Sequence, residues 1–283
     1  MNTHANDTGI LYIVATPIGH LDDMTLRAVE VLKTVDFIAA EDTRHSRHLL
    51  DHFGIDNRLV AYHEHNETDS ANGLIQELLS GKSIALISDA GTPLISDPGY
   101  VIVSKAHAAG LRVVPIPGAS ALITALSASG LPSDRFYFEG FLPAKSGARC
   151  AVLESLKSVP STLIFYESPH RIMDSLTDMQ TIFGADREAV LARELTKTYE
   201  TIKKDSLREL IAFLNTDNVQ QKGEFVVLVG GQQIDKNAEI TEEAKKILGI
   251  LSSELPLTQA AKIAAKMTGL KKSTLYDWAV ANS

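Results

Sequence analysis

Residues 84–93 of the chain read Ile-Ala-Leu-Ile-Ser-Asp-Ala-Gly-Thr-Pro. The first half of this stretch is almost wholly apolar, which is typical of a strand buried on both faces of a parallel sheet. The second half consists of small residues and a proline, which let a backbone approach a ligand closely on a stiff support. We therefore predict a strand over 84–88 that is buried on both faces. We expect the loop at its carboxyl end to lie where open α/β sheets bind their ligands.

Two further loops of this kind follow predicted strands. Residues 16–19 read Thr-Pro-Ile-Gly, and residues 117–120 read Pro-Gly-Ala-Ser. A single loop of this composition is equally compatible with a tight turn that binds nothing. Three of them at the strand ends of one sheet favour a pocket.

The first part of the chain alternates β-rich segments with helical patterns. Strands are predicted at 10–15, 36–40, 58–62, 84–88 and 113–116. Helices are predicted at 25–34 with Thr25 as N-cap, at 44–53, in a segment ending near Gly81, and from Pro98 to Gly110. Strict alternation implies an α/β fold with a parallel sheet and helices on both faces.

The second part of the chain is less regular. Strands are predicted at 136–141, 162–166, 189–193, 199–203 and 225–229. The third and fourth are too close in sequence for a crossover helix, so they should pair antiparallel in a mixed sheet. We expect an N-terminal α/β domain over 1–118 that carries the substrate-side loops and a C-terminal α/β domain over 119–232 that completes a cleft. The polar segment 231–237 reads as a linker, and a small helical extension fills 233–283.

The helical extension differs from the rest of the chain in its pattern and its charge. Helical patterns at 242–252, 258–267 and 273–281 enclose a short turn with Gly269, which resembles a helix-turn-helix. From Ile240 onward there are 6 Lys, no Arg and 4 acidic residues, a charge of +2, which leaves −10 for residues 1–239 out of the total of −8. A lysine-bearing helix face is often only solvated, but this one is a candidate surface for RNA.

Composition limits the class of protein. With 45% hydrophobic and 22% charged residues over 283 positions, the chain has the balance of a globular protein of about two domains. Cys150 is the only cysteine, which excludes an intrachain disulfide and favours a reducing compartment. Residues 1–9 are polar and no apolar run is long enough to span a bilayer, so we expect a cytoplasmic protein. The net negative charge disfavours a protein that coats nucleic acid nonspecifically.

Neither common nucleotide fingerprint is present. The strand-end loops lack Gly-x-Gly-x-x-Gly, and the chain has no Gly-Lys-Ser/Thr loop, so a Rossmann dinucleotide site and a P-loop are disfavoured. Asp89 is the single charged group in 84–92. It can cap the following turn, or it can bind a hydroxyl or amine of a ligand.

Polar residues end two other predicted strands of the first sheet. Residues 41–44 read Glu-Asp-Thr-Arg, and residues 62–67 read Tyr-His-Glu-His-Asn-Glu. On an extended segment His63 and His65 point to the same side and Glu64 to the other. No third ligand stands at a characteristic spacing, so we predict no metal. Clustering at the sheet edge favours substrate contact or proton transfer over ordinary loop polarity.

Five motifs together resemble the tetrapyrrole-methylase superfamily. They are Ala-Thr-Pro-Ile-Gly at 15–19, Glu-Asp-Thr-Arg at 41–44, Ser-Asp-Ala-Gly-Thr-Pro at 88–93, Pro-Gly-Ala-Ser at 117–120 and Phe-Tyr-Glu-Ser-Pro-His-Arg at 165–171. Within the superfamily the chain is most similar to the branch that methylates a cytidine ribose 2′-oxygen in 16S ribosomal RNA. The resemblance extends from about Ile10 to Gly230, and the helical tail is similar to that branch's extension.

The resemblance implies a class III methyltransferase fold that binds S-adenosylmethionine in a cleft between its two α/β domains. By position, it implies these cofactor-binding residues: Pro17, Ile18, Asp89, Gly91, Thr92, Ser120, Ala121, Tyr166, Ala192 and Phe225. It further implies a decoding-centre cytidine of 16S rRNA as substrate, within the 30S subunit, and a homodimer.

The identity of the catalytic base stays open. A ribose hydroxyl is a weak nucleophile at neutral pH, so a base or a cation should assist it. The candidate bases are Glu41, Asp42, His63 and Glu64. The candidate cations are Arg44 and Lys197, although Lys197 is equally compatible with an exposed hairpin position. The candidate RNA contacts are Thr43, Asn66, Lys262, Lys266, Lys271 and Lys272.

Two other functions remain possible at this point. One is a superfamily methyltransferase with another acceptor, such as a tetrapyrrole precursor or a diphthamide intermediate. The other is a nucleic-acid regulator without catalysis, which reads its target with the tail. The polar groups at the strand ends disfavour the second alternative, and the loops at 41–44 and 62–66 favour RNA over the first.

Overall fold

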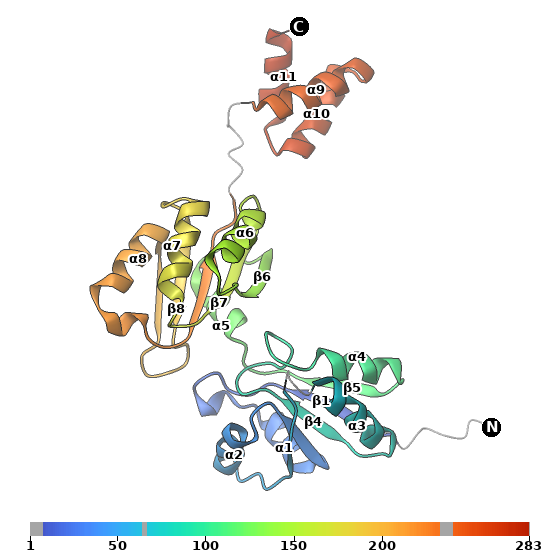
Figure 1. Ribbon diagram of the computed structural model, residues 1–283. Coiled ribbons are helices and arrows are strands. Elements are labelled where there is room, and N and C mark those ends of the chain that lie inside the picture. Colours follow the sequence, from blue (N-terminus) through green and yellow to red (C-terminus); the bar gives the residue numbers. More distant parts are fainter. Residues whose placement is uncertain (1–7, 64–66, 233–239, 283) are drawn as a thin grey trace, which may run out of the picture. The chain divides into compact units, whose positions relative to one another are not determined.

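The computed structural model describes residues 8–63, 67–232 and 240–282. The described residues of Met1–Lys157 and Ser161–Gly230 form one compact unit, and those of Ser158–Pro160 and Gly231–Ser283 form a second (Figure 1). The predicted limits of the domains at 118 and 232 remain predictions.

The first sheet of the larger unit is parallel throughout, as predicted. Its strands in spatial order are β3 (Leu59–Ala61), β2 (Phe37–Ala40), β4 (Ile84–Ile87), β1 (Ile10–Val14) and β5 (Arg112–Ile116). The quoted stretch forms the central strand, and all residues of β4 are buried. Its alternate side chains enter two different clusters, which is why the sequence of this strand is apolar at every position.

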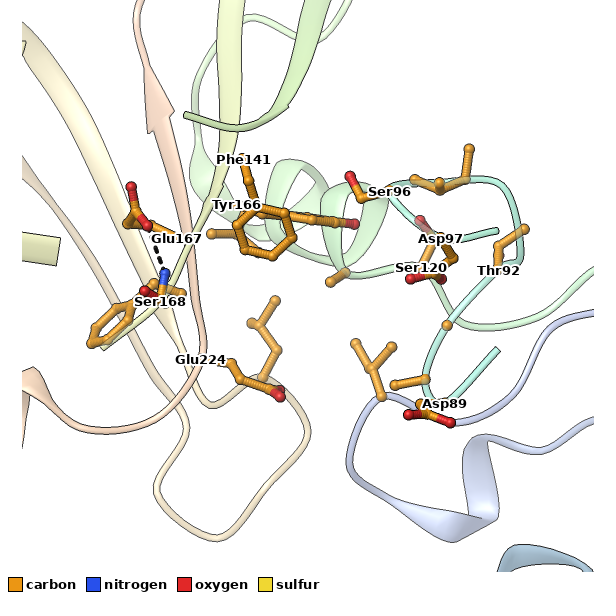
Figure 2. A pocket seen from close by; sticks show the side chains of 18 of the residues that line it. Asp89, Thr92, Ser96, Asp97, Ser120, Phe141, Tyr166, Glu167, Ser168 and Glu224 are labelled. Atoms are coloured by element: carbon orange, nitrogen blue, oxygen red, sulfur yellow. Dashed lines mark hydrogen bonds between the residues drawn. The ribbon is translucent and has the colours of Figure 1, made fainter. Parts of the chain in front are cut away.

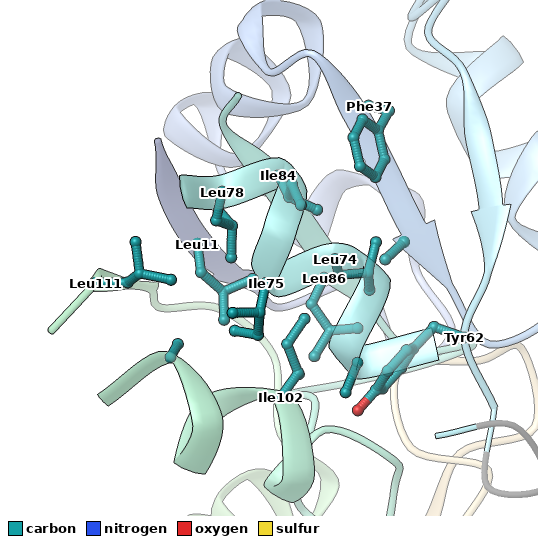
Figure 3. Close-up of a cluster of buried hydrophobic side chains, with 13 residues drawn as sticks. Leu11, Phe37, Tyr62, Leu74, Ile75, Leu78, Ile84, Leu86, Ile102 and Leu111 are labelled. Carbon is teal, nitrogen blue, oxygen red and sulfur yellow. The ribbon is translucent and has the colours of Figure 1, made fainter. Parts of the chain in front are cut away.

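Helices cover both faces of this sheet. Helices α1 (Leu26–Thr34) and α2 (Thr43–His52) pack on one face through residues such as Leu32 and Leu50. Helices α3 (Glu67–Leu79) and α4 (Tyr100–Ala108) pack on the other, where Leu78 and Ile102 meet Leu86 (Figure 3). Burying a leucine or isoleucine contributes about 1.5–3 kcal/mol, so these two clusters fix the layered arrangement.

The connections place a crevice beside β4. The chain leaves β4 for a helix on one face, whereas it leaves the neighbouring strands β1 and β2 for helices on the opposite face. Loops that diverge in this way leave a crevice at the carboxyl ends of the strands, the general ligand position of open α/β sheets.

The second sheet is mixed, as predicted. Its strands in spatial order are β6 (Phe136–Phe141), β7 (Thr162–Glu167), β10 (Phe225–Val229), β8 (Glu188–Arg193) and β9 (Thr201–Ser206). Only the β6–β7 pair is parallel among these, and β8 pairs antiparallel with β9 as the short connection required.

Helices also cover the second sheet. Helix α5 (Ala121–Ser129) packs on one face through Leu122 and Leu126. Helix α7 (Ile172–Phe183) packs against both α6 (Ser146–Leu156) and α8 (Leu207–Thr216), and a short 3-10 turn, η2 (Asn218–Gln221), follows α8. A second such turn, η1 (Leu21–Asp23), precedes α1.

The second unit contains the three helices predicted for the tail. They are α9 (Glu242–Glu254), α10 (Leu257–Thr268) and α11 (Lys272–Ala281), and α10 packs against the other two. Gly269 ends α10 in a left-handed conformation with φ 76°, which a residue with a Cβ adopts at a cost. Leu248, Ala261 and Leu275 are among the side chains of the small core.

Several predicted boundaries were wrong by one to three residues, and local contacts explain two of these differences. The strand predicted at 199–203 begins at Thr201, because the amide of Glu200 donates to the carbonyl of Lys197 and prolongs the turn. The helix predicted from Pro98 begins at Tyr100, since Gly99 has φ 142° and donates its amide to the Glu67 carboxylate at 2.8 Å. In the described part of the chain, no helix has the length and apolar character needed to cross a membrane.

Candidate functional site

A cavity of about 450 Å³ lies at the carboxyl ends of β1, β4 and β5, and residues of the second sheet form its opposite wall (Figure 2). Loops after the strands of the first sheet contribute Ile18, Glu41, Asp89, Gly91, Thr92, Asp97 and Ser120. The second sheet and its loops contribute Phe141, Tyr166, Glu167, Ala192, Leu195, Glu224, Phe225 and Val226. The volume of the cavity is within the usual range for small-molecule sites, about 300–1,000 Å³.

The three small-residue loops are joined to one another by hydrogen bonds. Thr16 and Gly91 exchange backbone hydrogen bonds of 2.8 and 3.0 Å, and Thr16 Oγ1 donates to the carbonyl of Ser88 at 3.2 Å. Thr92 Oγ1 donates to the carbonyl of Ala119 at 2.9 Å. Gly91 has φ 80°, a conformation that glycine adopts at no steric cost. This side of the cavity is therefore a fixed surface of backbone.

Asp89 connects two strand-end loops. Its Oδ1 accepts the backbone amide of Asp42 at 3.1 Å, which ties the loop after β4 to the loop after β2. Glu41, the residue before that amide, lines the cavity. Asp89 is thus both a wall residue and the support that positions Glu41.

Asp42 serves as the N-cap of α2. Its Oδ1 accepts the amides of Arg44 at 2.8 Å and His45 at 3.3 Å, and its Oδ2 lies 3.3 Å from the Arg44 guanidinium. These bonds, the amide of Arg44 first, lower the pKa of Asp42. A carboxylate committed to a helix cap is a weak proton acceptor, which disfavours Asp42 as the base.

Tyr166 forms the centre of the opposite wall. Its hydroxyl accepts the amide of Leu122 at 3.1 Å and so binds the N-terminus of α5. Its ring makes edge-to-face contacts with Phe138 and Phe141 at centroid distances of 4.9 and 5.6 Å. Burial is the main cause that raises the pKa of Tyr166, so the hydroxyl stays protonated at neutral pH.

Glu167 and Glu224 are carboxylates of that wall with cationic partners. Glu167 lies 2.9 Å from Arg171 and accepts the hydroxyl of Ser175 at 2.6 Å. Glu224 lies 2.8 Å from Lys197. The negative charge of each carboxylate is offset by its cationic partner, so both residues shape the cavity wall more than they add charge to it.

Lys197 is held in an ion-pair network. Its Nζ lies 3.0 Å from Glu194 in addition to the 2.8 Å contact with Glu224. Burial works against its charge, but the hydrogen bonds to Glu224 and Glu194 outweigh burial and raise the pKa of Lys197. Lys197 therefore stays a cation and is not an exposed hairpin residue, the alternative left open by the sequence.

The structure brings most of the predicted cofactor residues together. All of them except Pro17 line the cavity. Of the predicted catalytic residues, Glu41 lines the cavity, whereas His63 follows β3 and is half-buried. Glu64 and Asn66 lie outside the described residues. Thr43 and Arg44 begin α2, and the four lysines of the tail belong to the second unit.

Sequence reasoning missed Asp97, Ser96 and Phe141, which also line the cavity. Burial, and then the nearby carboxylates of Glu41 and Asp89, raise the pKa of Asp97 to about 7 against an opposing hydrogen bond from Ser88. A signal was present, because Asp97 belongs to the same strand-end loop as Asp89 and directly precedes a proline. Phe141 had no such signal, since half-exposed aromatic residues at strand ends are common.

Comparisons with known proteins agree with this geometry. The sequence profile of the family Tetrapyrrole (Corrin/Porphyrin) Methylases matches residues 10–211, and that of the RsmI C-terminal HTH domain matches residues 238–283. The Ribosomal RNA small subunit methyltransferase I of Pseudomonas aeruginosa is 55% identical over 96% of this chain and 97% of its own length.

Solved structures share the fold at low sequence identity. A diphthine synthase superposes with a TM-score of 0.62 and 17% identity over 78% of this chain and 90% of its own. A uroporphyrin-III C-methyltransferase from Thermus thermophilus, complexed with S-adenosylhomocysteine, superposes with a TM-score of 0.55 and 19% identity over 78% of this chain and 97% of its own. The chain therefore belongs to the tetrapyrrole methylase family, in the branch of the ribosomal RNA small subunit methyltransferases I, and it is a methyltransferase.

Proposed function

We propose that this chain transfers a methyl group from S-adenosylmethionine to the ribose 2′-oxygen of a decoding-centre cytidine in 16S ribosomal RNA. The observation that carries the proposal is the cavity beside β4, built from three joined loops and an aromatic wall. The near-full-length similarity to an enzyme named for the small-subunit ribosomal RNA supports RNA as the acceptor.

The cavity fits the cofactor in size and chemistry. Ile18, Leu195 and Val226 offer apolar surface for a purine, and the small residues beside Gly91 let the fixed backbone approach a ligand closely. Asp89 and Asp97 offer negative charge to a cationic ligand. Among the described lining residues none is Lys, Arg or His, which suits a sulfonium and disfavours a phosphate-rich dinucleotide.

The reaction needs little beyond orientation and one proton acceptor. When bound, the sulfonium would supply an electrophilic methyl group, and the electron pair of its S–C bond would go to sulfur on transfer. The residues of the chain hold the ribose oxygen in line with that bond, and such positioning contributes about 7–11 kcal/mol in well-oriented reactions. The hydroxyl proton then leaves to a base of the protein or to water.

The geometry favours some candidate bases over others. Glu41 lines the cavity and is held there through the bond from the Asp42 amide to Asp89. Asp42 is committed to the cap of α2. We therefore place Glu41 ahead of Asp42, with His63 as the other described candidate.

Basic residues outside the cavity are candidates for RNA contact. The side chain of Arg44 is 91% exposed at the start of α2, close in sequence to Glu41. Lys262, Lys266, Lys271 and Lys272 are exposed on α10, α11 and the turn between them. Phosphate contacts by such side chains supply affinity without reading sequence, which an acidic protein needs for an RNA substrate.

We further propose that the substrate is the assembled 30S subunit. We also propose that the active form is a homodimer. Edge strand β6 supports a homodimer, because Phe136 and Tyr137 are 42% and 45% exposed along it. Exposed aromatic residues are enriched at protein interfaces. Light scattering during gel filtration measures the oligomer directly.

Transfer of a labelled methyl group tests the reaction and separates it from its rivals. The purified protein is incubated with labelled S-adenosylmethionine and, in turn, free 16S rRNA, 30S subunits lacking the modification, and a tetrapyrrole precursor. We expect label in RNA, at the 2′-oxygen of one cytidine, with 30S subunits as the better substrate. Label only in the tetrapyrrole would support the rival acceptor, and no transfer would support a non-catalytic regulator.

A second experiment tests the pocket. Replacing Asp89 by Ala removes a charged wall group and the support of Glu41, so the affinity for S-adenosylmethionine should fall at least about tenfold. Asp134→Ala, at an exposed position outside the cavity, is the matched control. Calorimetry that finds unchanged affinity for Asp89→Ala would argue against the cofactor assignment.

A further inference from the structure

The loop that carries Asp97 into the cavity has an unusual backbone. Leu94 and Ser96 have φ values of 74° and 68°, the left-handed region that residues with a Cβ rarely occupy. Such conformations are strained and persist where the surrounding structure enforces them, often at functional sites. The result is that Asp97 lines the cavity together with Ser96 (Figure 2).

The surroundings of Asp97 are acidic. The carboxylates of Glu41 and Asp89, from the loops after β2 and β4, act on it, and the charge of Asp97 in turn acts on Tyr166 of the opposite wall. The hydroxyl of Ser88 is its hydrogen-bond partner. No described Lys, Arg or His lines the cavity to neutralise this wall.

The carboxylates of the far wall differ in this respect. Glu167 lies 2.9 Å from Arg171, and Glu224 lies 2.8 Å from Lys197. The negative charge available to a ligand is therefore concentrated on the wall of the first sheet, with Asp97 partly buried within it.

We propose that Asp97 is the carboxylate by which the pocket distinguishes the cationic sulfonium of S-adenosylmethionine from the neutral thioether of S-adenosylhomocysteine. This inference depends on the proposed function. A positive charge beside Asp97 stabilises its ionised form, so binding of the sulfonium expels a proton from the carboxyl group. Once the methyl group has left, the sulfur is neutral and that attraction is lost, which favours release of the product.

The size of the effect follows from the coupling between protonation and binding. Asp97 has a pKa of about 7 in the free protein. Below that pH a ligand that requires the ionised form loses about tenfold in affinity for each pH unit. The affinity for S-adenosylmethionine should therefore fall about tenfold from pH 8 to pH 6, and that for S-adenosylhomocysteine should change much less.

Titration calorimetry of the full chain tests this without any RNA. Both ligands are titrated at pH 6 and pH 8 into the wild type, Asp97→Asn and Asp97→Glu, with Asp134→Asn as an exposed control. Amino groups of the ligands titrate equally with every variant, so the difference between wild type and Asp97→Asn isolates Asp97. Repetition at pH 7 in buffers of different ionisation enthalpy counts the protons released.

At pH 7, binding of S-adenosylmethionine should release about half a proton more from the wild type than from Asp97→Asn. Asp97→Asn should lose the preference for S-adenosylmethionine, and Asp97→Glu should restore part of it. If Asp97→Asn keeps the wild-type preference and pH dependence, the inference is wrong while the cofactor assignment stands. If the wild type binds neither ligand at any pH, the proposed function itself fails.

Discussion

The backbone amide of His20 donates a hydrogen bond of 3.1 Å to Oγ1 of Thr196, a residue 176 positions later in the chain. His20 follows the loop after β1, and Thr196 lies between β8 and β9. Glu194 and Thr196 have φ values of 50° and 63°, so the second loop holds a strained shape where it meets the first. Ile18 and Leu195, next to this contact, both line the cavity. The contact therefore joins the two walls of the site.

Gly19 tests this contact. A Cβ at Gly19 would lie 2.6 Å from Cγ of Lys197 and 3.0 Å from the carbonyl oxygen of Leu195, so Gly19→Ala must push the loops apart. We expect a loss of about 1–3 kcal/mol in the free energy of unfolding, measured with urea, and weaker binding of S-adenosylmethionine.

Gly73 is the matched control for that substitution. It lies inside α3, and nothing lies within 4 Å of where its Cβ would be. Gly73→Ala should stabilise the protein by about 0.5–1 kcal/mol and leave binding unchanged. Equal behaviour of the two alanine variants would contradict a close contact at Gly19.

The ion pair of Arg149 and Asp178 should stabilise the packing of α6 against α7. Their side chains are 4% and 19% exposed, and Nε of Arg149 lies 2.7 Å from Oδ2 of Asp178. Asp178→Ala leaves the guanidinium buried without its counter-charge, which costs about 3–5 kcal/mol of unfolding free energy. Glu154→Ala breaks an exposed pair with Lys157 and should cost less than about 1 kcal/mol. Denaturant unfolding of both variants measures the difference.

Asp97 should lower the stability of the protein at neutral pH. Its pKa rises from 3.8 to about 7 on folding, so the native state binds more protons than the unfolded state between these values. The contribution of Asp97 to the free energy of unfolding therefore decreases as the pH rises from about 4 to 7. After allowance for partial exposure, Asp97→Asn should be more stable than wild type by about 1–2 kcal/mol at pH 8. The gain should shrink at pH 5, and a constant difference across this range would speak against the raised pKa.

The lysines of α10 should contribute to RNA affinity through phosphate contacts. Lys262 and Lys266 are exposed and stand one helical turn apart. Replacing both by Gln should weaken binding to 16S rRNA and reduce the slope of log affinity against log salt by about 1–2 units. Cofactor affinity should not change, and Lys33→Gln on α1, which removes one positive charge outside the tail, serves as a control. An unaltered salt slope would exclude these lysines from the interface.

The sequence was sufficient for the strands of both sheets and for the helices of the first sheet and of the tail, whereas helices α5 to α8 and the order of the strands came only from the structure. Patterns of apolar residues report burial directly, so the apolar run at β4 predicted a strand covered on both faces, and Thr25 predicted the start of α1. The antiparallel pairing of β8 and β9 followed from the short connection alone. The errors in the predicted strands were local, such as the start of β9, where hydrogen bonds within the preceding turn delay the beginning of the strand.

By itself, the sequence also predicted three of the loops that form the site, those at 16–19, 88–93 and 117–120, because the carboxyl ends of parallel strands must meet at one edge of the sheet. It left the roles of the individual side chains undecided. Only the tertiary structure showed that Asp42 caps a helix, that Lys197 is neutralised by Glu194 and Glu224, and that Asp97 lines the cavity beside Glu41 and Asp89. Burial and charge at these positions depend on neighbours distant in the chain, whereas the periodicity of a strand or helix depends on neighbours a few residues away.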